Sequence, residues 1–249
     1  MSGHSKWSTI KRQKGATDAR RGQLFTKLAR EITVAARTGL PDPESNGRLR
    51  LAVQRARAEN MPRDNIERAI ERATVSGAGD NFEEVTYEAF LPGGIALMVQ
   101  SQTDNRNRTV SEVRAVITRG GGNVGADGSV AWMFDNVGQI VVKQGEMSED
   151  DVAMLAIDAG ATEFEPDGET TVVFTEPSDL HKVQEQLAEA GLDIEAADLV
   201  MRATDLISVE PDQAVKVIRV IEKLEDLDDV QNVYSNLEVT DEVFAQVSA

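Results

Sequence analysis

The 249-residue chain contains no cysteine, which excludes disulfide bonds, thiolate metal ligands and a cysteine nucleophile. Aromatic residues make up only 4% of it and histidine occurs twice, so a base-stacking sheet and a His-based zinc site both lack the residues that they need. No apolar run approaches the roughly 18 residues of a membrane span. No apolar segment follows the charged N-terminus as in a signal peptide. We therefore expect a cytoplasmic globular protein with no metal ion and no other cofactor.

Catalytic motifs are also missing. The chain has no Gly-x-Ser-x-Gly elbow. A glycine-rich stretch at 120–128 resembles a phosphate loop, but it lacks the Gly-Lys-Ser/Thr ending and precedes a predicted strand instead of a helix. With 43 Asp and Glu residues in the chain, no single carboxylate pair is informative. We expect no catalytic residue and no small-molecule substrate, so the chain is predicted not to be an enzyme.

Charge is distributed unevenly along the sequence. Residues 1–75 hold 16 Lys and Arg against 8 Asp and Glu, whereas the rest of the chain has a net charge of −25. Residues 1–30 alone carry +7 within a protein of net charge −17. A local basic concentration on an acidic protein is typical of an element that faces a polyanion, although an ordinary solvated helix face is the alternative. The sign changes in the small-residue segment 75–80, which is predicted to be a linker.

The segment before this linker is predicted to be helical throughout. Helices are expected at 18–38, 44–59 and 63–73, separated by Gly39 with Pro41 and by a tight turn at 60–62. In the first helix the apolar positions repeat with helical spacing and basic residues occupy the opposite face. We predict a three-helix bundle, preceded by a basic arm, as a domain of residues 1–76.

After the linker the pattern is that of an α+β protein. Strands are predicted at 85–91, 95–103 and 130–134, with a helix at 107–119 before the last of them. The next segment is predicted to follow the order β-α-β-β-α-β of the ferredoxin-like motif. A final helix and strand, at 212–224 and 230–234, would complete the first group. The predicted fold is therefore α+β and multidomain, with the three-helix bundle and two ferredoxin-like α+β domains, one inserted in the other. The expected domains are 1–76, 80–135 plus 205–249, and the inserted 136–204.

Four long motifs carry a family resemblance. They are GHSKWSTIKRQKGATDARRGQLFTKLAREI, RLRLAVQRARAENMPRDNIERAIERA, TDNRNRTVSEVRAVITRGGGNVGADGSVAWMF and LEDLDDVQNVYSN. Together they resemble the YebC family, whose members are described as probable transcriptional regulators and include mitochondrial translational activators. The resemblance spans nearly the whole chain. It implies three domains, one of them split by another, and a role in bacterial or organellar gene expression.

The candidate nucleic-acid-binding residues lie in two places. Lys and Arg can neutralise phosphates and Trp7 can stack on a base, although packing of Trp7 on the bundle is an equal alternative. The segment 103–109 offers two Arg and two Asn at a helix start, where the alternative is a simple cap and turn. The predicted binding residues are Lys6, Trp7, Lys11, Arg12, Lys14, Arg20, Arg21, Lys27, Arg30, Arg37, Arg106 and Arg108.

Three hypotheses for function follow. The favoured one is a ribosome-associated translation factor that contacts ribosomal RNA, because the basic helix face is poor in base-reading amides. The second is a transcriptional regulator that binds duplex DNA. The third is a protein-interaction scaffold that uses its acidic surfaces. No dimerisation stripe is apparent, which favours a monomer, and no membrane partner is expected.

Overall fold

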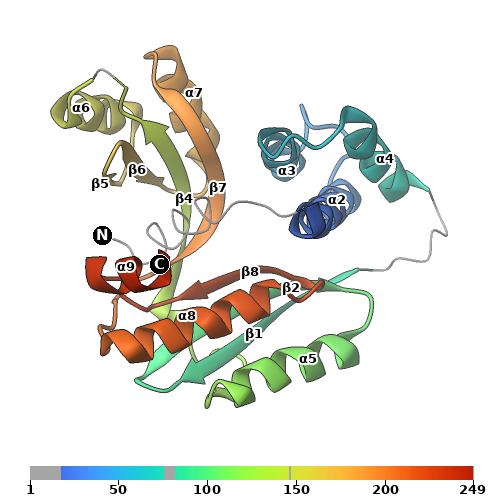
Figure 1. Cartoon of the computed structure of the whole chain (residues 1–249). Coiled ribbons are helices and arrows are strands. Elements are labelled where there is room, and N and C mark those ends of the chain that lie inside the picture. Colours follow the sequence, from blue (N-terminus) through green and yellow to red (C-terminus); the bar gives the residue numbers. More distant parts are fainter. Residues whose placement is uncertain (1–17, 76–81, 146, 249) are drawn as a thin grey trace. The chain divides into compact units, whose positions relative to one another are not determined.

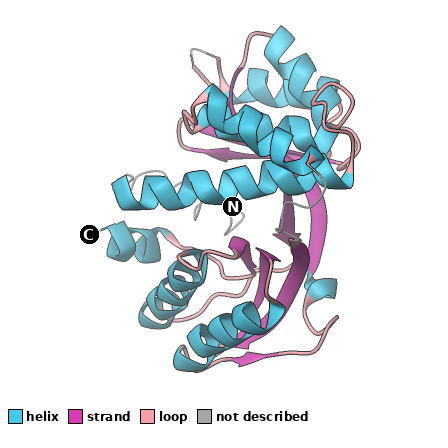
Figure 2. Ribbon diagram, turned by 90° about the vertical axis from the view of Figure 1, so that its right-hand side faces the viewer, coloured by secondary structure: helices cyan, strands magenta, loops and turns pink. Residues whose placement is uncertain are grey.

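The computed structural model describes residues 18–75, 82–145 and 147–248, which form two compact units (Figures 1 and 2). The first unit comprises 18–75, 82–131 and 212–233. The second unit comprises 132–145, 147–211 and 234–248.

Three helices open the first unit: α2 (Asp18–Thr38), α3 (Gly47–Ala58) and α4 (Arg63–Thr74). Their apolar faces enclose one core, in which Ile32 of α2 and Leu49 of α3 are fully buried. Burial of such a side chain contributes about 1.5–3 kcal/mol, so this core is what holds the helices together. Helix α3 begins three residues later than expected because Asn46 caps it, accepting a hydrogen bond from the amide of Leu49.

The predicted turn after α3 is confirmed and has a Schellman geometry. Asn60 adopts a left-handed conformation at φ 59°. The amide of Met61 then donates to the carbonyl of Ala56 at 2.9 Å, and that of Asn60 donates to the carbonyl of Arg57 at the same distance. The next residue, Pro62, cannot continue a helix, so a new helix starts in a new direction.

A four-stranded sheet in the order β3-β1-β2-β8 completes the first unit. Its strands are β1 (Glu83–Leu91), β2 (Ile95–Thr103), β3 (Asn123–Val124) and β8 (Val230–Ser235), with α5 (Arg106–Arg119) and α8 (Pro211–Glu225) packed on it. The β1–β2 hairpin matches the prediction, with Leu91 opposite Ile95. Gly93 and Gly94, both at positive φ, make its turn. Strand β8 therefore joins a sheet whose other strands lie about 100 residues earlier in the sequence.

The second unit holds the other sheet, in the order β5-β6-β4-β7 with every neighbouring pair antiparallel. Its elements are β4 (Phe134–Lys143), α6 (Glu149–Ala159), β5 (Glu163–Asp167), β6 (Thr170–Thr175), α7 (Leu180–Glu189) and β7 (Asp193–Ala203). The predicted chain order β-α-β-β-α-β is present here. The first sheet instead follows β-β-α-β and then α-β, so the ferredoxin-like connectivity describes the second sheet alone.

Three local features differ from the prediction. The strand expected at 130–134 is wrong: Ala131–Met133 is a 3-10 turn, and Phe134 already begins β4. On the side away from β2, β1 pairs instead with the two-residue β3, which lies in a glycine-rich stretch without any periodic signal. Helix α9 (Asp241–Ser248) was not anticipated. None of the helices in the described ranges has the length and apolarity needed to cross a membrane.

A buried carboxylate explains why residues 128–131 do not form a strand. Glu88 of β1 is only 8% exposed and accepts hydrogen bonds from the amides of Gly128 (2.6 Å), Val130 (2.6 Å) and Ala131 (3.0 Å). These amides are thus taken by a side chain and not by a neighbouring strand. Burial raises the pKa of Glu88, but the three amides and the Ser129 hydroxyl outweigh it, so the pKa lies below the ordinary value.

Replacing Glu88 by Gln should destabilise the protein by about 1–3 kcal/mol at pH 7, because a neutral amide cannot accept this set of charge-assisted bonds. Its NH2 group would also face the backbone N–H groups of the turn, which are donors themselves. Urea unfolding at pH 7 measures the effect. Glu112→Gln is the matched control, because Glu112 is exposed on α5. Its effect should stay within about 0.5 kcal/mol. Equal stability of the two variants would show that the carboxylate does not hold the turn.

Candidate nucleic-acid interface

Six of the twelve predicted binding residues have described side chains. Lys6, Trp7, Lys11, Arg12 and Lys14 lie outside the described residues, as does the side chain of Arg20. The structure places Arg21, Lys27, Arg30 and Arg37 on α2, and Arg106 and Arg108 in the first turn of α5. The environments of these six side chains differ sharply.

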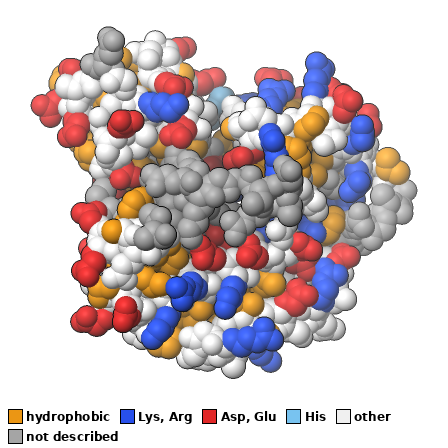
Figure 3. All heavy atoms as spheres, in the orientation of Figure 1, with side chains coloured by type: hydrophobic (Ala, Val, Ile, Leu, Met, Phe, Trp, Pro, Cys, Tyr) orange, Lys and Arg blue, Asp and Glu red, His pale blue; other side chains and the backbone are white. Residues whose placement is uncertain are grey.

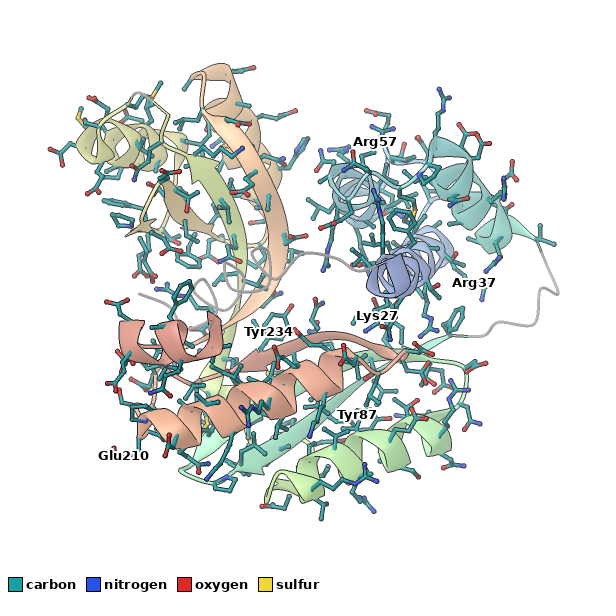
Figure 4. All side chains as sticks on the ribbon, viewed as in Figure 1. Lys27, Arg37, Arg57, Tyr87, Glu210 and Tyr234 are labelled. Carbon is teal, nitrogen blue, oxygen red and sulfur yellow. The ribbon has the colours of Figure 1, made fainter. Side chains whose placement is uncertain are left out.

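One face of α2 contacts an acidic turn of the same unit, residues 225–229 between α8 and β8. Gln23, Lys27 and Arg30 share this face because they are spaced by four and three residues. Gln23 donates to the carbonyl of Asp226 (2.6 Å) and to the carboxylate of Asp228 (3.0 Å). Lys27, labelled in Figure 4, donates to the carbonyl of Glu225 at 2.5 Å. These side chains are therefore bound within the protein and do not form an open basic face.

Arg30 makes the most contacts on this face. Its guanidinium donates to the carbonyls of Gln102 (2.8 Å) and Asp228 (3.0 Å) and to the carboxylate of Asp229 (3.0 Å). The group also lies 4.9 Å from the ring centre of Phe82. Its side chain is 12% exposed, so it joins α2 to β2 and to the acidic turn instead of standing in solvent.

Asp229 is the common partner of three segments. Besides Arg30, its carboxylate accepts from the hydroxyls of Thr103 (3.0 Å) and Thr109 (2.7 Å) and from Arg108 (2.7 Å). Only 3% of the Asp229 side chain is exposed. An unpaired carboxylate at this depth would cost several kcal/mol, so the surrounding donors are a condition of its burial.

The electrostatics of this cluster follow from that geometry. Burial raises the pKa of Asp229, but the hydrogen bonds from Arg108, Thr109 and Thr103 together bring the pKa below its ordinary value. The hydrogen bond of Arg108 to Asp229, and secondly its hydrogen bond to Asp104, raise the pKa of Arg108. Both groups are therefore charged at neutral pH, and each stabilises the other.

A second charged contact joins the helices to the sheet. Arg48 of α3 makes a two-pronged contact with Glu84 of β1, one bond of which measures 2.9 Å. Hydrogen bonding raises the pKa of Arg48 and lowers that of Glu84. Both side chains are more than 40% exposed, so this pair contributes at most about 1 kcal/mol. It orients the helices more than it stabilises them.

The segment 103–109 is organised as a helix cap. Asn105 accepts a hydrogen bond from the amide of Arg108 at 3.1 Å, and Thr103 accepts one from the amide of Asn105 at 2.9 Å. Arg106 pairs with Glu83 at 3.5 Å, and both of these side chains are exposed. The cap-and-turn alternative thus describes the contacts that the structure shows. A contact of Arg106 or Arg108 with nucleic acid stays a prediction.

Exposed arginines remain on the helices. Arg21 is exposed and lies 5.8 Å from the ring centre of Phe25, and Arg37 is exposed at the end of α2. Further exposed arginines, which are not among the predicted binding residues, lie on α3 and α4; they include Arg57, Arg68 and Arg72. The sequence does indicate that these arginines are exposed, because each lies on the helix face opposite the repeating apolar positions. Figure 3 shows Lys and Arg side chains over this part of the molecule.

Acidic residues of this site were not predicted either. Glu84 pairs with Arg48. Asp229 pairs with Arg30 and Asp228 accepts a hydrogen bond from Gln23, yet the sequence context of these two aspartates marked them only as members of a large acidic set. The signal that could have found them is the run LEDLDDV, which combines acids with apolar residues between a helix and a strand.

The fold and the site define a class: a multidomain α+β protein whose basic helical region is joined through ion pairs to an acidic sheet region. Residues 5–76 match the TACO1/YebC protein N-terminal domain, and residues 82–237 match the TACO1/YebC second and third domain. The chain belongs to the TACO1/YebC family.

Relatives match along the whole chain. A probable transcriptional regulatory protein of Chlorobaculum tepidum is 49% identical over 246 residues, covering 98% of each chain. One of Methylococcus capsulatus is 50% identical over 248 residues, covering 99% of this chain and all of the relative. The crystal structure of a conserved hypothetical protein from Aquifex aeolicus is similar with a TM-score of 0.81 at 46% identity. That match covers 89% of this chain and 91% of the other.

Replacing Asp229 by Asn should destabilise the protein by about 1–3 kcal/mol at pH 7, because Arg30 and Arg108 lose their charged acceptor. The folded pKa of Asp229 lies below its unfolded value. Its contribution is therefore present above the ordinary pKa of an aspartate and is lost as the pH falls through the folded pKa. The stability gap between wild type and variant should narrow in acid.

Urea unfolding between pH 7 and pH 3 measures this gap. Asp226→Asn is the control, because the exposed Asp226 offers α2 its carbonyl and not its carboxylate. A gap that is absent at pH 7, or that is the same at every pH, would contradict the role given to the Asp229 carboxylate.

Proposed function

We propose that this protein is a non-enzymatic regulator of gene expression that binds nucleic acid through its basic N-terminal region. The observation that carries the proposal is the charge of +7 in residues 1–30 of a protein with net charge −17. Lys and Arg that neutralise phosphates release condensed counterions, which supplies most of non-specific nucleic-acid affinity. The acidic remainder repels polyanions, which favours docking at exposed basic surfaces such as this region.

The contacts on α2 narrow the proposed interface. Lys27 and Arg30 are bound to the acidic turn. Their role in the proposed interface would therefore be to position α2 and not to contact phosphates. The direct phosphate contacts are assigned to the arm residues Lys6, Lys11, Arg12 and Lys14, to Arg20 and Arg21, and to the exposed arginines of the helices. Trp7 is assigned to base stacking beside them.

Ribosomal RNA is the favoured target. Duplex DNA readers usually place amides and arginines of one helix in the major groove. The amide on the basic face of α2 is Gln23, and it is bound to Asp226 and Asp228. The amides of Asn46 and Asn105 belong to helix caps. A basic helix face that is poor in free amides suits a structured RNA, where shape and phosphate contacts suffice.

Duplex DNA is the second candidate. The observation in its favour is that relatives at about 49% identity are named probable transcriptional regulatory proteins. Phosphate contacts look alike on both polymers. Both candidate functions therefore use the basic arm, and they differ in which polymer the arm binds more tightly.

Replacing Lys11 and Lys14 together by Ala should weaken binding about tenfold and lower the salt slope of log K by roughly 0.7–0.9 for each lost phosphate contact. Binding of a labelled ribosomal RNA hairpin and of a duplex DNA of equal length, each over a range of salt concentrations, measures this. Sedimentation of the full-length protein with ribosomal subunits in a gradient tests the target.

The matched control is Lys143→Ala with Lys182→Ala, which removes two positive charges from the second unit. Its affinity and salt slope should equal those of the wild type. Wild-type protein that binds neither polymer would overturn the proposed function. A sequence-specific footprint on duplex DNA, with no protein in the ribosomal fractions, would replace RNA by DNA.

We further propose the domain layout 1–76, 80–135 with 205–249, and an inserted 136–204. What supports it is that β8 shares a sheet with β1, β2 and β3, while β4 to β7 form their own. Strands β4 and β7 also pair where the insertion would begin and end, with Phe134 opposite Ala203. Entry and exit of the insertion are therefore close together, as an independently folding insertion requires.

Replacing residues 139–198 by Asn-Gly should leave a protein that still unfolds cooperatively, because Gly138 and Leu199 are opposite each other and Asn-Gly favours a two-residue turn. Truncation after residue 205 should instead remove α8 and β8 and uncover the apolar face of the first sheet. Thermal melts followed by circular dichroism compare the two. A truncated chain that folds, beside a deletion that does not, would refute the layout.

A further inference from the structure

The acidic part of the chain concentrates its few basic residues on two helices. Ten Lys and Arg follow residue 75, and seven of them lie on α5 and α8. This concentration was not apparent in the sequence, because α5 and α8 are separated by about 90 residues. Both helices belong to the first unit and pack on its sheet.

Five of these seven cations have no partner among the residues that the structure describes. Within the described part of the chain, no hydrogen bond, ion pair or ring contact is made by the exposed side chains Arg114, Arg119, Lys216, Arg219 and Lys223. The other two on these helices, Arg106 and Arg108, are paired with carboxylates. In a protein with 43 acidic residues, these five cations on two helices form an exposed surface without a carboxylate partner in the described ranges.

The cations of α8 form a ridge. Lys216, Arg219 and Lys223 follow one another by three and four residues, so they share the outer face of the helix. The opposite face is buried against the sheet. The three residues span about 10 Å at 1.5 Å per residue. One nucleic-acid strand presents about three phosphates over that length, at about 3.4 Å each. Helix α8 also carries three acids: Asp212 in its first turn, where a helix N-terminus stabilises it, and Glu222 and Glu225 near its end.

Helix α5 adds to this ridge because its C-terminal end lies against α8. A Cβ atom on Gly120, which follows α5, would lie 2.5 Å from a methyl group of Val220 in α8. Arg119 and Arg219 are the chain neighbours of these two contacting residues. Figure 3 shows Lys and Arg side chains gathered over α8 and α5. We call Arg114, Arg119, Lys216, Arg219 and Lys223 the α5–α8 ridge.

The chemistry of the ridge indicates what it binds. A protein–protein interface usually has an apolar or aromatic centre. The large hydrophobic side chains that are exposed in the described ranges all lie outside α5 and α8: Leu40, Val75, Trp132, Met154, Ile157, Leu199 and Leu206. Cations without an apolar centre suit a phosphate backbone, which they contact without reading bases.

We propose that the α5–α8 ridge is a second nucleic-acid contact, which binds the phosphate backbone independently of sequence. The inference rests on the proposed function and adds a surface to it. Two separate basic surfaces make more phosphate contacts than the arm alone and steepen the salt dependence of binding accordingly.

The test uses the full-length protein with Arg219→Ala and Lys223→Ala. Ala favours a helix, and both side chains are exposed, so the thermal melt should match that of the wild type. Affinity for the labelled ribosomal RNA hairpin and for the duplex of equal length should fall about tenfold. The salt slope should fall by about 1.4–1.8, the value for two lost contacts. Lys143→Ala with Lys182→Ala, which removes the same charge elsewhere, should change neither quantity.

The outcomes separate this inference from the proposed function. If the Lys11 and Lys14 variant weakens binding while the Arg219 and Lys223 variant does not, the ridge is no contact and the proposed function stands. If the ridge variant and the control pair weaken binding equally, the effect is one of net charge and the inference is overturned. If sedimentation shows that the ridge variant loses self-association while its nucleic-acid affinity is unchanged, the ridge binds the acidic face of a second copy.

Discussion

The buried carboxylate of Asp229 is the constraint on which much of the first unit depends. It accepts hydrogen bonds from α2, from the end of β2 and from the first turn of α5. A carboxylate can be buried only if its oxygen atoms are almost fully used, because an unpaired charge in a low dielectric is too costly. The three segments must therefore come together around it. One side chain thus couples the helices to the sheet.

This arrangement divides the cations of the first unit into two groups. Arg30, Arg48 and Arg108 are paired with carboxylates where segments meet, and there they orient the chain. Arg219 and Lys223 are among those that lie on outer helix faces with no partner in the described residues. Net charge does not distinguish the two groups. For Arg30 and Arg108 the difference lies in the burial of Asp229, because a cation near a buried acid replaces water as its partner, whereas one on a solvated face keeps its water.

The glycine-rich stretch after α5 illustrates how a local pattern can resemble a ligand site. Successive backbone amides at such a stretch form a concave group of donors that attracts an anion. In this protein the anion is the carboxylate of Glu88, supplied by β1 about 40 residues earlier. The resemblance to a phosphate loop therefore has a physical basis. The amides serve the packing of the turn, and this contact also replaces the strand that the apolar residues at 130–134 had suggested.

The sequence by itself determined the elements whose signal is local. Apolar spacing, caps and turn residues lie within a few positions of each other, so most of the helices, the β1–β2 hairpin and the turn at Asn60 could be predicted. So could the charge asymmetry and the family resemblance. Strand β3 and helix α9 could not, because the first is two residues long and the second follows no clear periodic run. Only the tertiary structure decided which basic residues of the candidate site are bound internally. Arg30 and Asp229 are 199 positions apart, and no local pattern records which of the 43 acids a given cation meets.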